Sequence, residues 1–513
     1  MSTPTLPQPV RRPPAAPERP FRPAPGPLVA VVAVVAALAR LPFLTTPLTP
    51  DEGGFLMVAG QWHPGRSLYG DYWVDRPPLL ITLLEPVARW SHAALGLHLL
   101  GTVAVVASVL LAGRVAALLG PGRRWLPVLG AVTAAVFLLC PLFGAASEVD
   151  GEVLGVPFVL ASLVAALTAT RTNERRPRIG WWVVAGAAAL AAVGVKQSLA
   201  DGFVGAAAVL VWLVLTRRRP RAVEGLVAFG AGALGALVGL LAWAAVHGTD
   251  PGPLWDAVVG FRTQAGAVIS AGAPSTYHAR AVRLALAFLG SGAVVVALAA
   301  LVPGRLPTPS RPPSRAPGYA TAPVDSRLLL VALLCWELVA VALGGSYWLH
   351  YLVGTVPGLV VAAVVVATHR PRRLVVVGLA LAWAVTTTVV HDVRTGIGGG
   401  GSATDVAVER YLTAHAGPGD TGVVAFGNPV LLQASGLASP YPELWSLPVR
   451  VRDPHLAALT AVLESPRRPT WLVVAGDSLD TWGVDSATAQ QAADRHYRLR
   501  TVIGDWQVLH VRP

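Results

Sequence analysis

The charged residues best suited to chemistry follow the first long apolar run of the chain. Asp51 and Glu52 form an acidic pair there, and Arg76 comes about two dozen residues later, directly before Pro77 and Pro78. A carboxylate in such a place can act as a general base, bind a metal ion or remain a solvated charge. The planar guanidinium of arginine matches phosphate oxygens, although an arginine at a membrane surface can also simply extend into the interface. The stretch therefore pairs a candidate base with a candidate phosphate ligand.

The composition indicates a protein that crosses a membrane many times. Of the 513 residues, 54% are hydrophobic and 13% are charged, and the mean hydropathy is +0.57. Soluble domains carry about 25% charged residues. The formal net charge of +12 comes from arginines that lie in short clusters between apolar runs. That placement fits the positive-inside rule better than a nucleic-acid-binding face.

Eleven apolar segments approach or reach the length needed to cross a hydrocarbon core of about 30 Å. Residues 1–27 are rich in proline and arginine, so we predict a disordered cytoplasmic tail before a transmembrane domain over 28–390. The long tail and the lack of a small-residue cleavage site argue against a cleaved signal peptide. The predicted spans are 28–44, 92–119, 125–140, 152–170, 180–196, 199–216, 223–246, 282–303, 327–344, 351–368 and 374–390.

The distribution of basic residues predicts the orientation. Arginines cluster in the tail and in every second loop, whereas the opposite loops carry acids or almost no charge. The N-terminus is therefore expected to be cytoplasmic, and an odd number of helices places the C-terminus outside. We expect a multi-pass protein of the cytoplasmic (plasma) membrane.

The last part of the chain, residues 391–513, lacks long apolar runs. Gly396 to Gly401 form a flexible joint, and short helical and strand patterns follow without a glycine-rich nucleotide-binding loop. The fold class predicted is an α-helical polytopic membrane protein with about eleven transmembrane helices and a small C-terminal α/β extracytoplasmic domain. Within that domain we predict helices over 403–415 and near 454–464, and strands at 422–426, 471–475 and near 497–511.

Most polar residues that could take part in catalysis or binding fall in loops that this topology places outside. They come from five outer loops that are far apart in the sequence, and they are expected to converge on the outer face. They are Asp51, Glu52, Asp71, Asp75, Arg76, Glu148, Asp150, Glu152, Lys196, Gln197, Asp201, Arg262, Tyr277, His278, Arg280, His350 and Tyr351.

The first outer loop resembles that of the GT-C membrane glycosyltransferases, and within them the branch of protein O-mannosyltransferases and of the aminoarabinose transferase that modifies lipid A. The resemblance rests on Asp51-Glu52 and on Asp71-Tyr72-Trp73-Val74-Asp75-Arg76-Pro77-Pro78. Three weaker matches keep the same order and the same side of the membrane. They are Ser147-Glu148-Val149-Asp150-Gly151-Glu152, Gly194-Val195-Lys196-Gln197, and Ser346-Tyr347-Trp348-Leu349-His350-Tyr351. The resemblance covers about residues 28–390.

The resemblance implies a polyprenyl-phosphate sugar donor that is used on the outer face of the membrane. Asp51 would then be the general base that activates the acceptor hydroxyl, and Glu52 would orient that hydroxyl or the sugar. Asp150 or Glu152 would be the second acid, and the spacing supports either one. A single base suffices for one in-line displacement, which predicts inversion at the anomeric carbon.

The same resemblance implies how the donor phosphate is held. Arg76 would bind the departing lipid phosphate with Lys196, and the late element with His350 and Tyr351 would complete the donor site. Cations at these positions would neutralise the charge that develops on the leaving group. The expected partners are the lipid-linked donor, the bilayer, and an envelope glycan, lipid or protein as acceptor, with no nucleic acid.

Other observations leave alternatives open. A transporter or flippase of lipid-linked envelope precursors is the main alternative, although transporters place polar residues at midplane and often show repeated halves. Glu337 lies near the middle of a predicted span and fits that pattern. A non-catalytic assembly role is a third possibility. No cofactor is indicated, and a divalent cation is compatible with the acids although no ligand spacing, nor that of Cys140 and Cys335, is diagnostic of a metal site.

Overall fold

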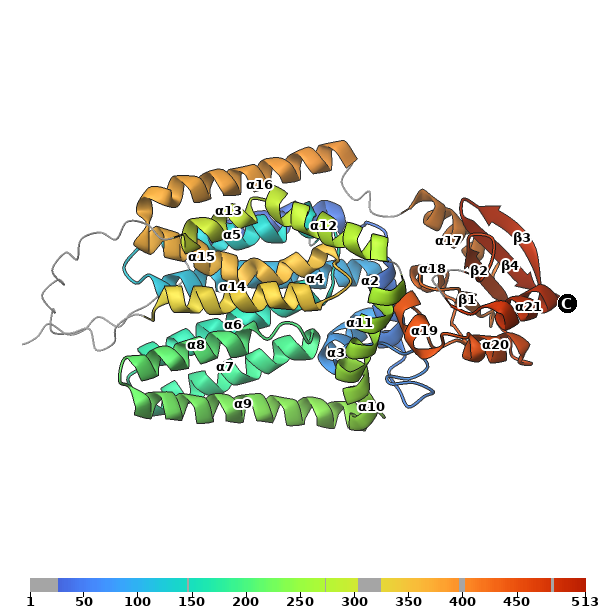
Figure 1. The fold of residues 1–513 in the computed structure, drawn as a ribbon, viewed down its shortest axis with the longest axis horizontal. Coiled ribbons are helices and arrows are strands. Elements are labelled where there is room, and N and C mark those ends of the chain that lie inside the picture. The colour runs from blue at the N-terminus through green and yellow to red at the C-terminus, as the bar shows by residue number, and fades with distance from the viewer. Residues whose placement is uncertain (1–25, 145–146, 273, 303–323, 396–401, 481–483) are drawn as a thin grey trace, which may run out of the picture.

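The computed structural model describes residues 26–144, 147–272, 274–302, 324–395, 402–480 and 484–513, and it is predominantly helical (Figure 1). The predicted tail over 1–27 lies almost entirely outside the described residues, as does the joint from Gly396 to Gly401. The helices that coincide with predicted spans are α1 (Pro27–Arg40), α4 (Ala93–Leu119), α5 (Leu126–Leu138), α6 (Gly151–Arg171), α7 (Arg175–Val195), α8 (Asp201–Leu215), α9 (Arg219–Val246), α12 (Pro274–Gly290), α13 (Ala293–Leu301), α14 (Ser326–Leu343), α15 (Val356–His369) and α16 (Leu374–Thr395).

These helices confirm a polytopic membrane protein, while the number eleven stays a prediction. Within the described ranges, seven helices are long and apolar enough to cross a membrane, or eight when α12 and α13, which meet at 69°, count as one span. Four shorter apolar helices have 10–17 residues, and they include α1, α5 and α8. Helix α15 lies at the centre of the bundle, because its residues from Val356 through Ala367 are all buried.

Several short helices cover the end of the bundle next to the C-terminal residues. Most of them lie where the sequence predicted loops, although η1 falls within the predicted span 28–44 and η4 overlaps the predicted span 351–368, and they carry or surround the candidate site residues. They are η1 (Leu41–Phe43), α2 (Pro50–Gly60), α3 (Pro78–Ala88), η2 (Pro141–Phe143), α10 (Pro251–Trp255), η3 (Asp256–Gly260), α11 (Phe261–Gly272) and η4 (Leu349–Thr355); η5 (Pro371–Arg373) precedes α16.

Helix α2 is the main correction to the predicted loop. Thr49 and Glu52 form a capping box, in which each side chain accepts a hydrogen bond from the other residue's backbone N–H. Pro50 occupies the first helical position, where its missing N–H costs nothing. The low helix propensity of Gly53 and Gly54 hid this helix in the sequence. Tertiary contacts offset that propensity, because both glycines are buried.

The C-terminal residues form a small α/β unit with helices on both faces of one sheet. The strand order is β1-β2-β4-β3, in which β1 and β2 run parallel and the other pairs antiparallel. Trp471 and Val473 of β2 face α17 and α18, whereas Leu472 and Val474 face α20 and α21. The elements are α17 (Ala403–His415), β1 (Gly422–Val424), α18 (Val430–Ser435), α19 (Ser446–Arg452), α20 (Ala457–Glu464), β2 (Trp471–Ala475), α21 (Ala487–His496), β3 (Tyr497–Ile503) and β4 (Trp506–Val511).

The final segment differs from its prediction in one respect. The single strand expected near 497–511 is a hairpin, in which β3 and β4 are joined at Gly504 and Asp505. Gly504 has a φ of 59°, a left-handed conformation that glycine adopts without a Cβ penalty. The prediction missed the turn because β-branched and apolar residues continue on both sides of it.

The C-terminal unit packs onto one end of the membrane helices (Figure 1). The Trp73 N–H donates to the Pro442 carbonyl at 2.9 Å, and the Arg66 guanidinium donates to the Pro440 carbonyl at 2.8 Å. The Arg452 guanidinium also lies over the Trp73 ring, 4.5 Å from its centroid. The segment between α2 and α3 is therefore held by the C-terminal unit.

We expect Gly54→Ala to destabilise the protein. A Cβ at this position would overlap the indole ring of Trp445, which packs against α2. Overpacking of this kind costs about 1–3 kcal/mol, so the melting temperature of the detergent-purified protein should fall measurably. Gly60→Ala in the same helix is the control, because its Cβ would meet only Ala88 at an ordinary 3.7 Å. Equal melting temperatures for the two variants would contradict this account.

Candidate active site at the outer end of the membrane bundle

Asp51 and Glu52 lie side by side in the first turn of α2 but have different surroundings. Asp51 is half-buried, whereas Glu52 is 1% exposed. The Glu52 carboxylate accepts the backbone N–H of Thr49 at 2.8 Å and that of Val149 at 2.7 Å. Charged hydrogen bonds of this type contribute about 1.5–3 kcal/mol each. Glu52 therefore ties the second outer loop to α2, which suits a positioning residue better than the expected contact with an acceptor or a sugar.

Arg76 stands at the start of α3, where Pro77 is the N-cap and Pro78 the first helical residue. A residue before proline is held out of the helical region, so the chain turns sharply at this point. The Arg76 guanidinium forms an ion pair with Asp75 at 2.5 Å and lies over the Phe55 ring, 5.4 Å from its centroid. Burial opposes its charge, but Asp75 and Asp51 outweigh that effect and raise the pKa of Arg76. The two residues proposed from the sequence as base and phosphate ligand are thus electrostatic neighbours.

Asp75 holds a second guanidinium. Its carboxylate pairs with Arg262 of α11 at 2.6 Å as well as with Arg76. Burial disfavours the ionised form, but the charges of Arg262 and Arg76 outweigh it and hold the pKa of Asp75 below its usual range. One carboxylate therefore places two arginines from distant parts of the chain together.

Lys196 ends α7 and joins this region from the other side. It forms a buried ion pair with Glu152 of α6 and lies over the Tyr351 ring, 4.7 Å from its centroid. The next residue, Gln197, donates its side-chain amide to the Asp75 carbonyl at 3.1 Å. This contact links the Lys196 turn directly to the segment that carries both Asp75 and Arg76.

Asp150 and His350 form a separate acidic cluster. Asp150 caps α6 by accepting the backbone N–H groups of Glu152 and Val153. His350 Nδ1 lies 3.1 Å from Asp150 Oδ2 and 3.5 Å from Glu148 Oε2. Burial raises the pKa of Asp150 to about 7, partly opposed by His350. An environment with two carboxylates disfavours phosphate, and the role of His350 in binding the donor phosphate stays a prediction.

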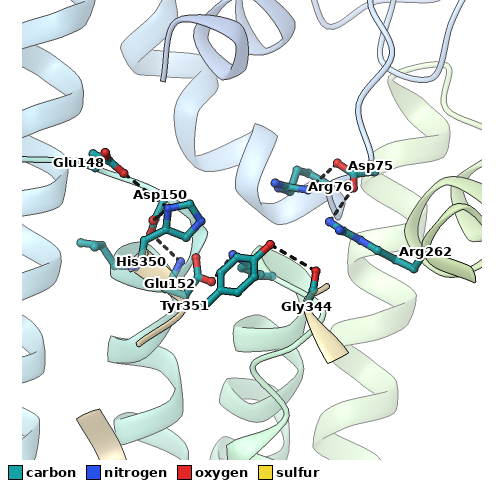
Figure 2. A network of polar contacts seen from close by, with 11 residues as sticks. Asp75, Arg76, Glu148, Asp150, Glu152, Arg262, Gly344, His350 and Tyr351 are labelled. Atoms are coloured by element: carbon teal, nitrogen blue, oxygen red, sulfur yellow. Dashed lines mark hydrogen bonds and ion pairs between the residues drawn. The ribbon is translucent and has the colours of Figure 1, made fainter. Parts of the chain in front are cut away.

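Figure 2 shows how the predicted site residues divide. Glu148, Asp150 and His350 gather on one side, and the arginine pair with Asp75 gathers on the other. Between them in this view stands Tyr351, whose hydroxyl is 3.5 Å from the Gly344 carbonyl. The structure therefore brings Arg76, Lys196 and Tyr351 to one cationic region, and His350 borders it, because its ring lies 5.1 Å from that of Tyr351 between centroids.

The pairing of two important contributors was not predicted from the sequence. Asp75 and Arg262 were among the polar outer residues, but nothing in their spacing indicated that they pair. Asp75 could have been suspected from its position directly before Arg76. Arg262 could not, because 186 residues of chain separate it from that arginine and only packing of α11 brings them together.

The buried pair of Lys196 and Glu152 allows a stability test. Glu152→Gln or Lys196→Met alone leaves an uncompensated buried charge, which costs about 3–5 kcal/mol. The double variant should unfold much closer to the wild-type temperature, because neither charge remains. Thermal unfolding of the purified protein measures all three. Arg175→Met, which breaks a mostly exposed pair with Glu224, should change little; additive losses in the double variant would contradict the pairing.

Comparisons with known proteins address the fold. No family model and no curated protein sequence matches the chain. Among solved structures, ArnT from Cupriavidus metallidurans bound to undecaprenyl phosphate superimposes with a TM-score of 0.59 at 14% identity, covering 94% of this chain and 97% of that one. The Archaeoglobus fulgidus oligosaccharyltransferase tethered with an acceptor peptide gives 0.52 at 11% identity, covering 94% and 74%. Both similarities extend over the membrane helices and the C-terminal unit together. The chain has the GT-C fold, as the resemblance of its first outer loop indicated.

Proposed function

We propose that this protein is a membrane glycosyltransferase that moves a sugar from a polyprenyl-phosphate donor to an acceptor hydroxyl outside the cytoplasmic membrane. The observation that carries the proposal is the cluster of Arg76, Arg262 and Lys196 beside Asp51 at the outer end of a GT-C fold. The solved neighbours with undecaprenyl phosphate and with an acceptor peptide support a lipid-linked donor and an external acceptor.

The cluster of Arg76, Arg262 and Lys196 is suited to bind the lipid phosphate as it departs from the sugar. Arg76 and Arg262 both share the Asp75 carboxylate, so each keeps guanidinium N–H groups for other oxygens. Arginine can offer two parallel donors to a phosphate, which gives both charge and orientation. Charge that develops on the departing phosphate would meet groups already fixed in place, which lowers the barrier without reorganisation.

Asp51 is the residue that we assign as general base. It is half-buried, lies next to the arginine that would hold the donor, and is not one of the residues that tie the loops together. It would accept the proton of the acceptor hydroxyl as oxygen attacks the anomeric carbon, while the phosphate departs with the electrons of the broken C–O bond. One displacement of this kind inverts the anomeric configuration.

The choice between the two candidate second acids follows from their partners. Glu152 neutralises Lys196, so its role is to hold that cation toward the donor phosphate. Asp150 faces His350 instead, and its Oδ2 accepts no hydrogen bond from the described residues. We therefore assign Asp150 as the second acid and Glu152 as a positioning residue.

A divalent cation fits the cluster of Glu148, Asp150 and His350. Their candidate ligand atoms lie within 4.8 Å of one another, and the separations of 3.1 and 3.5 Å from His350 approach the roughly 3.3 Å edge of a tetrahedral site with bonds of about 2.0–2.1 Å. A cation bound there would offset the negative charge of Glu148 and Asp150. It would also polarise a substrate oxygen that it coordinates.

We expect Asp51→Asn to abolish sugar transfer without affecting folding. Loss of a general base lowers the rate about 10²–10⁴-fold. A deletion strain complemented with the variant should show, by mass spectrometry, the same missing envelope glycan and accumulated lipid-linked intermediate as the deletion alone. Asp250→Asn, an exposed outer acid, should restore the wild-type pattern. A wild-type pattern from Asp51→Asn would remove Asp51 from the reaction.

The proposed site requires the C-terminal unit to lie outside the cell. In a Cys335→Ser background, a cysteine introduced by Asp480→Cys should react with an impermeant maleimide in intact cells, because residue 480 is exposed. A cysteine introduced by Arg124→Cys, in the loop after α4, should react only after permeabilisation. The reverse pattern would invert the topology and place the cationic cluster in the cytoplasm.

A further inference from the structure

A cavity of about 230 Å³ extends from the cationic cluster into the membrane bundle. Lys196 and Arg262 line one part of it, and Asp201 at the start of α8 and Glu337 of α14 line another. At about 30 Å³ for each water, the cavity is too large for a single solvent molecule and smaller than most pockets that enclose a whole ligand. Its size suits one polar portion of a larger molecule.

The cavity wall carries an excess of hydrogen-bond acceptors. Four of its buried oxygens receive no hydrogen bond from any described residue: Glu152 Oε2, Gln197 Oε1, Asp201 Oδ1 and Glu337 Oε2. The orientation of the Gln197 amide is fixed, because its nitrogen donates to the carbonyls of Asp75 and Val258. An orphaned buried polar atom costs about 1–3 kcal/mol, and more if it is charged. The cavity therefore requires an occupant that brings N–H or O–H donors.

Contacts with α15 fix the position of the Glu337 carboxyl group. Its Oε1 accepts the backbone N–H of Gly358 at 2.7 Å, in the first turn of α15. A Cβ at position 358 would collide with Oε2, so only glycine leaves room for the carboxyl group. Asp201 and Glu337 line the same cavity, and each is only 2% exposed.

Two other occupants fit less well. A hydrocarbon chain would leave all four oxygens without donors, at the cost given above. A single metal ion needs ligand atoms that converge, but the described residues form such a group only at Glu148, Asp150 and His350, away from Asp201 and Glu337. The four acceptors come from α6, the turn after α7, α8 and α14, and all four residues line one cavity. A ring that carries several hydroxyl groups offers donors to more than one of them.

We propose that this cavity binds the sugar of the lipid-phosphate donor, and that Asp201 and Glu337 determine which sugar is accepted by receiving hydrogen bonds from its hydroxyl groups. The inference rests on the proposed function, since a phosphate held by Lys196 and Arg262 would place the attached sugar at the mouth of the cavity. The Trp336 ring, fixed by its hydrogen bond to the Ser198 carbonyl at 3.2 Å, supplies an apolar wall for the ring's C–H groups. Sites that hydrogen-bond a substrate hydroxyl discriminate strongly against analogues that lack it.

The test compares probes with and without a sugar. Detergent-purified full-length protein is titrated calorimetrically with farnesyl phosphate and with farnesyl-phosphoryl mannose, glucose and arabinofuranose. Wild-type protein should bind at least one glycosylated probe about tenfold or more tightly than farnesyl phosphate. Asp201→Asn and Glu337→Gln should each weaken that probe about ten- to a hundredfold. Their affinity for farnesyl phosphate should stay within about twofold.

Two further variants distinguish a loss of sugar binding from a loss of folding. Gly358→Ala changes no charge but displaces the Glu337 carboxyl, so it should reproduce the selective loss and carries the test if Glu337→Gln does not fold. Glu224→Gln, an acid paired with Arg175 and Arg178 at the other end of the bundle, is the matched control and should bind every probe normally.

Different results would contradict the proposed donor class and the proposed sugar-binding cavity. Arg76→Ala should weaken all probes alike, because it acts on the phosphate. If farnesyl phosphate and its glycosides all fail to bind wild-type protein, the proposed donor class is wrong. If they bind, but no sugar improves affinity or the Asp201 and Glu337 variants affect sugar-bearing and sugar-free probes equally, the cavity is not the sugar site.

Discussion

The outer end of this protein depends on one carboxylate that two guanidinium groups share. Asp75 holds Arg76 at 2.5 Å and Arg262 at 2.6 Å, and it is only 8% exposed. Two arginines brought together at a membrane surface would repel each other, and a buried acid would resist ionisation. Together the three groups satisfy one another. They also join the segment after α2 to α11, so the same interaction that makes the cluster stable fixes its geometry.

The rest of the outer end is arranged by similar ties between distant segments. Glu52 accepts a hydrogen bond from Val149, and Gln197 donates to the Asp75 carbonyl. The C-terminal unit adds a third tie through Trp73 and the Pro442 carbonyl. Each tie satisfies a polar group that burial would otherwise leave without a partner. Stability and preorganisation therefore come from the same contacts. Of the 13 buried side-chain atoms without a hydrogen-bond partner among the described residues, four belong to residues that line the cavity beside the cluster.

Particular helices, strands and site residues show how far the structure could be predicted from the sequence. The helix over 403–415 and the strand core at 422–424 were predicted closely, because their patterns are local. Helix α2 was missed, since Gly53 and Gly54 weaken the local signal and burial against the C-terminal unit overrides it. Among site residues, Arg76 and Lys196 lie in the cationic region as expected. His350 lies beside Tyr351 at the border of that region, and nothing in its own sequence neighbourhood revealed that Asp150 and Glu148 would face it.

The sequence by itself determined the membrane character of the chain, the approximate positions of its helices and the clustering of polar residues at one end. These follow from hydrophobicity and its periodicity, which act over a few neighbouring residues. Which charges pair followed from the packing of distant segments: Asp75 with Arg262, and Lys196 with Glu152. Which charged residues become partners depends on how the helices pack, and packing joins residues that are tens to hundreds of positions apart. The sequence around a single acid or base does not indicate its partner.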